Sequence, residues 1–270
     1  MKIFITGSAG FIGRHLLEFY QEHEVFALTR QMNIDEELNR FKPDVIINSA
    51  AEIYNPESMW ASNVQTTVSC LEYVKHSQTK MIQIGSSSEY GPMPRASAET
   101  DAINPIDMYQ ATKGAATILC QGYARQYKLD IVVARPYSVY GLYEKPHRLF
   151  PRLCRAFKRN EPMKLYQGYH DFIYIDDFIR GIDLLMNTSA PLGDVVNFGS
   201  GIQYSNFAVL EIFEQVTGHK APVELVDTMV KNFENDVWIC NTDYAEKQYG
   251  FKTKVDLKTG IEQLLTFKGN

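Results

Sequence analysis

The chain lacks the features that mark secreted, membrane-bound or nucleic-acid-binding proteins. Its 270 residues hold only four cysteines, which are far apart and have no histidine cluster beside them, so neither a disulfide framework nor a metal site is predicted. Basic residues number 27 against 32 acidic ones, and no basic run stands out, which argues against a nucleic-acid surface. No apolar stretch approaches the roughly 18 residues that span a bilayer. We therefore expect a cytoplasmic protein with reduced thiols at Cys70, Cys120, Cys154 and Cys240.

What is present is typical of a globular enzyme with a sizeable core, since 45% of residues are hydrophobic and 22% are charged. Short apolar runs alternate with helix-length amphipathic patterns, an alternation that builds a parallel sheet covered on both faces. The first run, residues 3–5, is expected to be a core strand and not a cleaved signal. Strands are predicted at 3–5, 25–28, 44–48, 81–84, 131–134 and 195–198; helices at 11–20, 35–41, 62–76, 108–128 and 206–216; and short elements ending in a helix at 237–270.

Three glycines, Gly7, Gly10 and Gly13, stand between the first predicted strand and the first predicted helix. Gly7 permits a tight turn, Gly10 lets backbone N–H groups approach a phosphate, and Gly13 lets helix and strand pack closely. This geometry places a dinucleotide pyrophosphate on a helix N-terminus. A simple turn is the alternative for an isolated glycine triplet, but its position here favours a nucleotide site.

Tyr109 and Lys113 are four residues apart at the start of a long predicted helix, so they share one face. An ammonium near a phenol favours the phenolate, and we expect it to lower the tyrosine pKa toward the working pH. Such a tyrosine can give or take a proton at a carbinol or ketone oxygen. A tyrosine at a helix edge beside a solvated lysine is the alternative.

A serine-rich segment, residues 85–91, follows the predicted strand 81–84. Ligands bind beyond the carboxyl ends of parallel strands, so these hydroxyls are expected to face the cleft. Ser86 can donate a hydrogen bond to a substrate oxygen and hold it against Tyr109. A serine-rich turn leading to Pro92 and Pro94 is the alternative.

Together these segments resemble the extended short-chain dehydrogenase/reductase family, in its branch of NAD(P)-dependent nucleotide-sugar epimerases, dehydratases and reductases. The resemblance covers nearly the whole chain. It rests on residues 6–13, 43–51, Asn63 with Val64, 86–91, Tyr109 with Lys113, 135–141 and 171–177.

The resemblance implies an α/β fold, a Rossmann-type doubly wound parallel sheet with a smaller C-terminal substrate lobe. We assign residues 1–141 and 171–202 to the dinucleotide domain and residues 142–170 and 203–270 to the lobe, with the ligand between them. Ser86, Tyr109 and Lys113 would be the catalytic residues, and Lys113 would also hold the nicotinamide ribose. The implied cofactor-binding residues are Gly7, Gly10, Phe11, Ile12, Gly13, Ala50, Ala51, Asn63, Tyr109, Lys113, Pro136 and Tyr137.

The cofactor preference is predicted from Thr29 and Arg30, which end the second strand. An acidic residue there would bind the ribose hydroxyls of NAD and repel a 2′-phosphate. A hydroxyl and a guanidinium suit that phosphate instead, so NADP(H) is the preferred cofactor and NAD(H) the alternative. An ordinary exposed arginine is the other interpretation of Arg30.

Two departures from the family bear on the substrate. Ser87 and Ser88 stand where dehydratases carry an acidic pair, which argues against sugar dehydration, and the single Glu89 is interpreted as structural. His170 stands where the family usually has an arginine for the nucleotide diphosphate, and its charge would depend on pH. The predicted substrate-binding residues are Ser87, Ser138, Arg148, Arg152 and His170.

These features predict a reductase that transfers hydride from NADPH to a keto group of a nucleotide-linked sugar, and we expect a 4-keto-6-deoxyhexose. The first alternative is an epimerase that uses the same residues with tightly held NAD. The second is a non-catalytic Rossmann protein that senses cofactor or binds a partner. The helices at 62–76 and 108–128 resemble those that pair in a family dimer interface, which predicts a homodimer, although their apolar positions would also simply cover the sheet.

Overall fold

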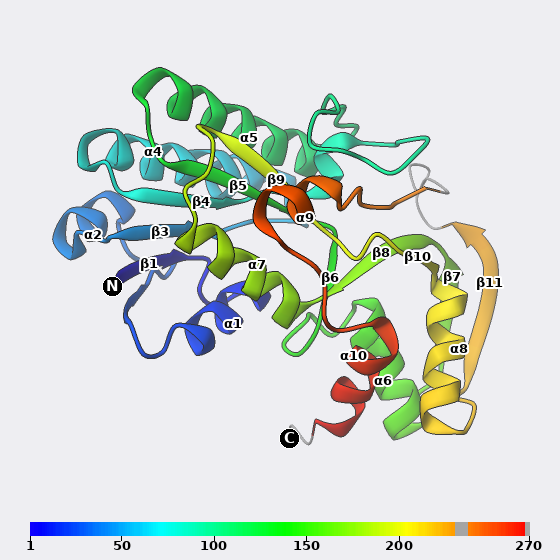
Figure 1. Ribbon diagram of the computed structural model, residues 1–270. Helices are drawn as coiled ribbons and strands as arrows, with labels where there is room; N and C mark the ends of the chain where they lie inside the picture. The colour runs from blue at the N-terminus through cyan, green and yellow to red at the C-terminus, as the bar shows by residue number, and fades with distance from the viewer. Residues whose placement is uncertain (230–236, 268–270) are drawn as a thin grey trace.

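Six parallel strands form the central sheet of the computed structural model, which describes residues 1–229 and 237–267 (Figure 1). All six predicted strands are present, and the predicted Rossmann-type class is confirmed. The order is β2-β1-β3-β4-β5-β9, so β2 is added on one side of β1 and β3 on the other, and the order in which strands are added reverses between β1 and β3. A ligand crevice forms at such a reversal. The strands are β1 (Lys2–Thr6), β2 (Glu24–Ala27), β3 (Val45–Asn48), β4 (Lys80–Ile84), β5 (Ile131–Pro136) and β9 (Asp194–Phe198).

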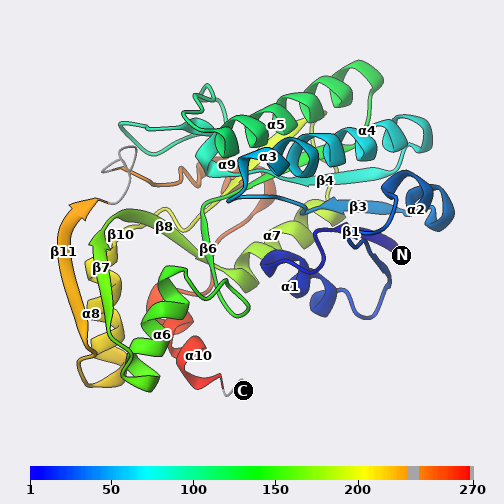
Figure 2. The same cartoon turned by 180° about the vertical axis from the view of Figure 1, so that it is seen from behind.

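Helices cover both faces of this sheet because apolar side chains alternate along its strands. Phe4 packs toward one face, whereas Ile3 and Ile5 pack toward the other. The Phe4 face carries α2 (Ile34–Phe41), α4 (Thr66–Ser77) and α5 (Met108–Tyr127); the opposite face carries α1 (Phe11–Phe19) and α7 (Ile175–Asn187) (Figures 1 and 2). The helix expected at 62–76 begins earlier, since α3 (Pro56–Met59) and a π-helical turn (Trp60–Gln65) lead directly into α4.

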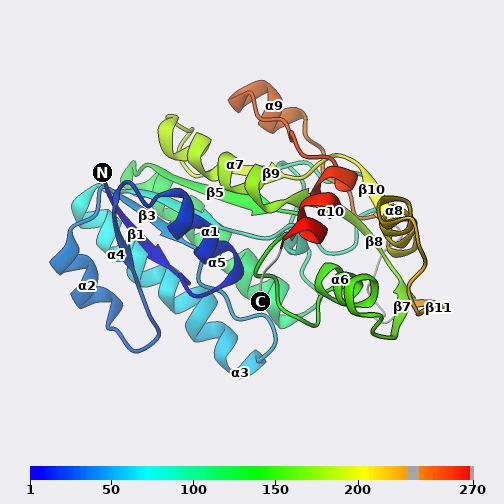
Figure 3. The same ribbon diagram turned by 90° about the horizontal axis from the view of Figure 1, so that it is seen from below.

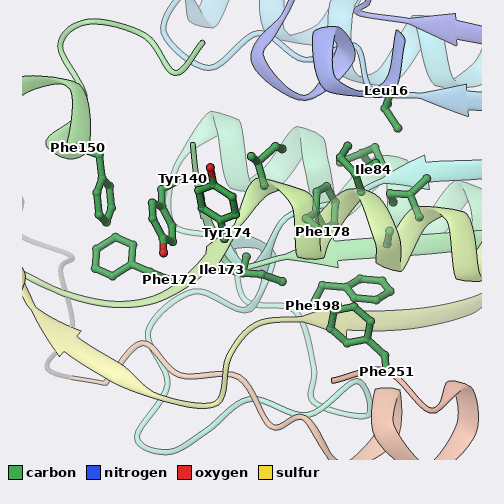
Figure 4. Close-up of a cluster of buried hydrophobic side chains, with 14 of the residues drawn as sticks. Leu16, Ile84, Tyr140, Phe150, Phe172, Ile173, Tyr174, Phe178, Phe198 and Phe251 are labelled. Atoms are coloured by element: carbon green, nitrogen blue, oxygen red, sulfur yellow. The ribbon is translucent and has the colours of Figure 1, made fainter. Parts of the chain in front are cut away.

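The smaller part of the molecule holds two short sheets (Figure 3). Buried aromatic rings continue from the central sheet into it: Phe178 and Phe198 lie 5.8 Å apart between ring centroids, and Tyr140 stacks on Phe150 at 4.1 Å (Figure 4). The two parts therefore share one core. The sheets are β10 (Gln203–Ser205), β8 (Tyr169–Tyr174) and β6 (Ser138–Tyr140), and β11 (Val223–Met229) with β7 (Met163–Gln167); the helices are α6 (Leu149–Arg159), α8 (Asn206–Thr217) and α10 (Leu257–Thr266).

One segment of the expected lobe lies elsewhere. Helix α9 (Asp243–Tyr249) packs against β9, where the hydroxyls of Tyr244 and Tyr249 donate to Asp194 at 2.9 and 2.6 Å. We keep the two-part division as a proposal and place this helix with the large sheet. Residues 230–236 and 268–270 of the expected lobe lie outside the described residues.

Two buried carboxylates join segments that are far apart in the sequence. Asp171 accepts hydrogen bonds from the backbone N–H groups of Ser200, Gly201 and Cys240 at 2.7–2.9 Å, and Asp177 accepts two more from the segment before α10. These acids of the 171–177 motif are therefore structural. In the described ranges, no helix combines the length and apolarity needed to cross a bilayer.

Candidate active site

A cavity of about 420 Å³ opens at the carboxyl ends of β1, β3 and β4, bordered by the smaller part. A larger, more open hollow of about 610 Å³ lies between α2 and α4 and holds none of the predicted site residues. The cavity, by contrast, is lined by most of them: Gly7, Gly10, Phe11, Ile12, Gly13, Arg30, Ala51, Ser86, Ser87, Tyr109, Lys113, Pro136, Tyr137, Ser138, Arg148 and His170.

The glycine turn fits a dinucleotide pyrophosphate. Gly7 has a φ of +64°, and a Cβ on it would lie 2.7 Å from the backbone nitrogen of Ala50. A Cβ on Gly13 would lie 2.2 Å from the carbonyl oxygen of Gly7, so helix α1 can approach the strand only with glycine there. Gly10 caps α1 without a side-chain hydrogen bond, and the first turn carries no acid. Its N–H groups therefore remain available to an anion.

Ser86 is held from beneath by a buried ion pair. It precedes a short 3₁₀ turn, Ser87–Tyr90, and its backbone N–H donates to Oε1 of Glu89 at 2.7 Å. The other oxygen of Glu89 accepts from Arg135 at 2.8 Å, and both side chains are almost fully buried. Glu89 is thus structural, in agreement with its interpretation from the sequence, and it fixes the backbone of Ser86.

Tyr109 and Lys113 occupy the first two turns of α5, on the face that borders the cavity. Tyr109 and Ser86 line the same cavity, and the hydroxyl of Ser86 bonds that of Ser88 at 2.7 Å. Lys113 is buried, and its ammonium donates to the carbonyl of Ile84 at the end of β4. Burial lowers the pKa of Lys113 to about 8. The structure thus brings the three predicted catalytic residues together.

The predicted lowering of the Tyr109 pKa is wrong for this structure. Burial raises the pKa of the phenol, and the influence of Ser86 opposes this only in part. Arg148, rather than Lys113, is the cation whose charge favours the phenolate. At neutral pH the phenol is therefore protonated and suited to donating a proton.

Four predicted site residues do not line the cavity. Thr29 is exposed after β2, and Ala50 donates its backbone N–H to Thr6 beneath the glycine turn. Asn63 is buried and bonds both backbone groups of Glu52, so it positions the loop after β3. Arg152 points to β7, where it donates to the carbonyl of Lys164. Their expected contacts with a ligand stay predictions.

Sequence reasoning missed several residues that line the cavity, among them Glu52, Tyr54, Glu144 and Trp238. Glu52 directly follows the expected Ala50-Ala51 pair, and Glu144 stands four residues before Arg148. Their position beside predicted site residues could have identified both. The hydroxyl of Tyr54 lies 2.8 Å from Nε2 of His147, which joins the loop after β3 to the loop before α6.

In residues 1–229 and 237–267, no three His, Cys, Asp or Glu side chains gather as metal ligands. The glycine turn, the strand reversal and the Ser86–Tyr109–Lys113 set define a dinucleotide-dependent enzyme of the short-chain dehydrogenase/reductase class. A model of the NAD dependent epimerase/dehydratase family matches residues 3–199, and the chain belongs to this family.

Known proteins resemble the chain over most of its length. A Bacillus subtilis protein described as an uncharacterized UDP-glucose epimerase, YtcB, is 26% identical over 99% of this chain and 98% of its own. A UDP-glucuronate 4-epimerase of Thermodesulfobacterium geofontis is 29% identical over 80% of this chain and 68% of its own. The crystal structure of a Bacillus cereus UDP-glucuronic acid 4-epimerase with UDP-glucuronic acid and NAD is 25% identical, with a TM-score of 0.84 and 97% of both chains covered.

Proposed function

We propose that this protein is a nucleotide-sugar 4-epimerase that uses NAD. The observation that carries the proposal is the single cavity that Ser86, Tyr109 and Lys113 share with the glycine turn. The epimerase names of the relatives support this reaction over reduction. Ser87 and Ser88, in place of an acidic pair, argue against dehydration.

In this reaction Ser86 would hold the oxygen of the reacting carbon, while Tyr109 would accept its proton and later return one. A bound nicotinamide supplies the hydride chemistry. Arg148, whose charge favours the phenolate, would assist proton acceptance, and Lys113 would hold the nicotinamide ribose. Bound geometry would supply much of the rate.

The test is the cofactor content and its balance during turnover. We expect the purified protein to release close to one NAD per chain on acid denaturation, and to interconvert 4-epimers of UDP-glucose or UDP-glucuronate with no added cofactor. Product chromatography with a reduced-nicotinamide assay measures both. Protein free of dinucleotide that consumes NADPH only when a keto-sugar is added would refute epimerisation.

Reduction of a nucleotide keto-sugar by NADPH is the second candidate, because two observations favour it. Burial raises the pKa of Tyr109, which keeps the phenol protonated as a reductase requires. Arg30, at the end of β2, borders the cavity and could hold a 2′-phosphate.

The surroundings of Arg30 favour NAD nevertheless. Its guanidinium lies 3.5 Å from Oε2 of Glu52, whose other oxygen accepts backbone N–H bonds from Ile53, Tyr54 and Asn55 at 3.0–3.3 Å. These bonds lower the pKa of Glu52 and keep it ionised. Arg30 is largely exposed, whereas the carboxylate is fixed, so Glu52 would accept from ribose hydroxyls and repel a 2′-phosphate.

We expect Glu52→Gln to raise the affinity for NADP relative to NAD about tenfold, since the amide keeps an acceptor and removes the charge. Calorimetric titration of the stripped protein with each dinucleotide measures this ratio. Glu57→Gln, at an exposed acid of α3, is the matched control. An unchanged ratio in Glu52→Gln would refute the role of Glu52 in cofactor choice.

Two further proposals concern assembly and location. A homodimer built on α4 and α5 is supported by large apolar residues exposed on and beside α5, including Met108, Ile118 and Trp60.

A cytoplasmic location is supported by the free thiols of four cysteines, Cys70, Cys120, Cys154 and Cys240.

A further inference from the structure

Glu144 is a buried carboxyl group with one unsatisfied oxygen. It lies in the loop between β6 and α6, and only 6% of its side chain is exposed. Oε1 accepts from Nε of Arg148 at 3.2 Å, whereas Oε2 finds no hydrogen-bond partner in the described part of the chain. Burial raises the pKa of this carboxyl to about 7. An ionised carboxyl that is buried with one oxygen unpaired poorly tolerates a second negative charge nearby.

Glu144 borders the reacting end of the cavity. Glu144, Arg148 and Tyr109 all line it. The charge of Arg148 acts on the phenol of Tyr109, in agreement with their place in one cavity. A sugar held by Ser86 and Tyr109 would therefore lie within reach of this pair.

The loop that carries Glu144 is anchored on both sides. The carbonyl of Leu142 is bonded to His15 of α1 at 2.9 Å, and the ring of Tyr143 packs on that histidine. Beyond Glu144, His147 is bonded to Tyr54, which lines the cavity. The carboxyl is thus fixed in place by contacts from α1 and from the loop after β3.

We propose that Glu144 determines substrate specificity: its buried carboxyl group excludes sugars that carry a carboxylate. The inference rests on the proposed function and narrows its substrate class to neutral nucleotide sugars. A uronate would meet a like charge beside the reacting centre. It could recruit Arg148 only by leaving Glu144 buried without its cation, which is strongly unfavourable.

Binding to the NAD-loaded protein tests this inference without turnover. UDP-glucose and UDP-glucuronate share one nucleotide, so the ratio of their dissociation constants cancels base preference. At about pH 8, where the carboxyl is mostly ionised, we expect UDP-glucose to bind at least about tenfold more tightly. Glu144→Gln should reduce the ratio about tenfold, chiefly by strengthening UDP-glucuronate, and should leave UDP itself unchanged.

Glu161→Gln is the matched control, because Glu161 forms a similar ion pair with Arg155 at 3.0 Å and does not line the cavity. Glu144→Ala, a second variant, should reduce the ratio as well. An equal change for UDP alone, or an unchanged ratio in both variants, overturns the assignment. Conversion of UDP-glucuronate at least as fast as UDP-glucose overturns it while sparing the proposed function. If the dissociation constants show the expected ratio but the protein epimerises no nucleotide sugar, the proposed function is refuted and the role of Glu144 in binding is not.

Discussion

Replacing Tyr109 by phenylalanine is expected to lower kcat about a thousandfold while leaving NAD binding within about twofold of the parent. The hydroxyl is a titratable group that lines the cavity together with Ser86, and phenylalanine keeps the ring but removes the proton. Both catalytic directions need that proton, so the loss should appear in kcat rather than in cofactor affinity. Steady-state kinetics and dinucleotide titration measure the two effects.

Tyr127→Phe is the control, since this tyrosine ends the same helix and is 37% exposed. It should retain the parent activity. A Tyr109→Phe protein that keeps more than about a tenth of the parent kcat would show that another group moves the proton.

Replacing Arg135 by methionine is expected to reduce the free energy of unfolding by about 3–5 kcal/mol. Arg135 is 3% exposed and forms the ion pair with Glu89, through Nε at 3.1 Å and Nη2 at 2.8 Å. Methionine fills similar space but leaves a buried carboxylate uncompensated. Because that carboxylate also binds the backbone of Ser86, kcat should fall as well. Denaturant unfolding gives the stability change.

Arg95→Met is the matched control at an exposed ion pair, Arg95–Asp101, where the arginine side chain is 60% exposed. Such pairs contribute about 0–1 kcal/mol. If Arg135→Met costs no more than this control, Glu89 is not held as a charged group, and the support assigned to Ser86 is wrong.

The fold followed from local signals in the sequence. Apolar runs bounded by polar residues predicted every strand of the large sheet, since a parallel strand is buried on both faces. The glycine turn and the Tyr109–Lys113 spacing were also local patterns, and the structure places both at one cavity. The position of α9 against β9 was not predicted, because it depends on bonds to Asp194, fifty residues earlier.

The electrostatics of the site could not be predicted in the same way. The sequence showed a lysine four residues after Tyr109, but the depth of burial, which raises the phenol's pKa, depends on the whole tertiary structure. Glu52 follows β3 and Arg30 follows β2, and these strands lie on either side of β1 in the sheet. The ion pair between the two side chains therefore depends on the strand order, which local sequence patterns do not reveal.

The most direct measurement of the central claim follows the hydrogen on carbon 4 of the sugar. The NAD-loaded protein would be incubated with UDP-glucose deuterated at that carbon, and the products examined by mass spectrometry and NMR. The account predicts that the 4-epimer forms with the deuterium retained, since one site removes and returns the same atom. Loss of the label to solvent or to added cofactor, or no 4-epimer from any nucleotide sugar, would contradict it.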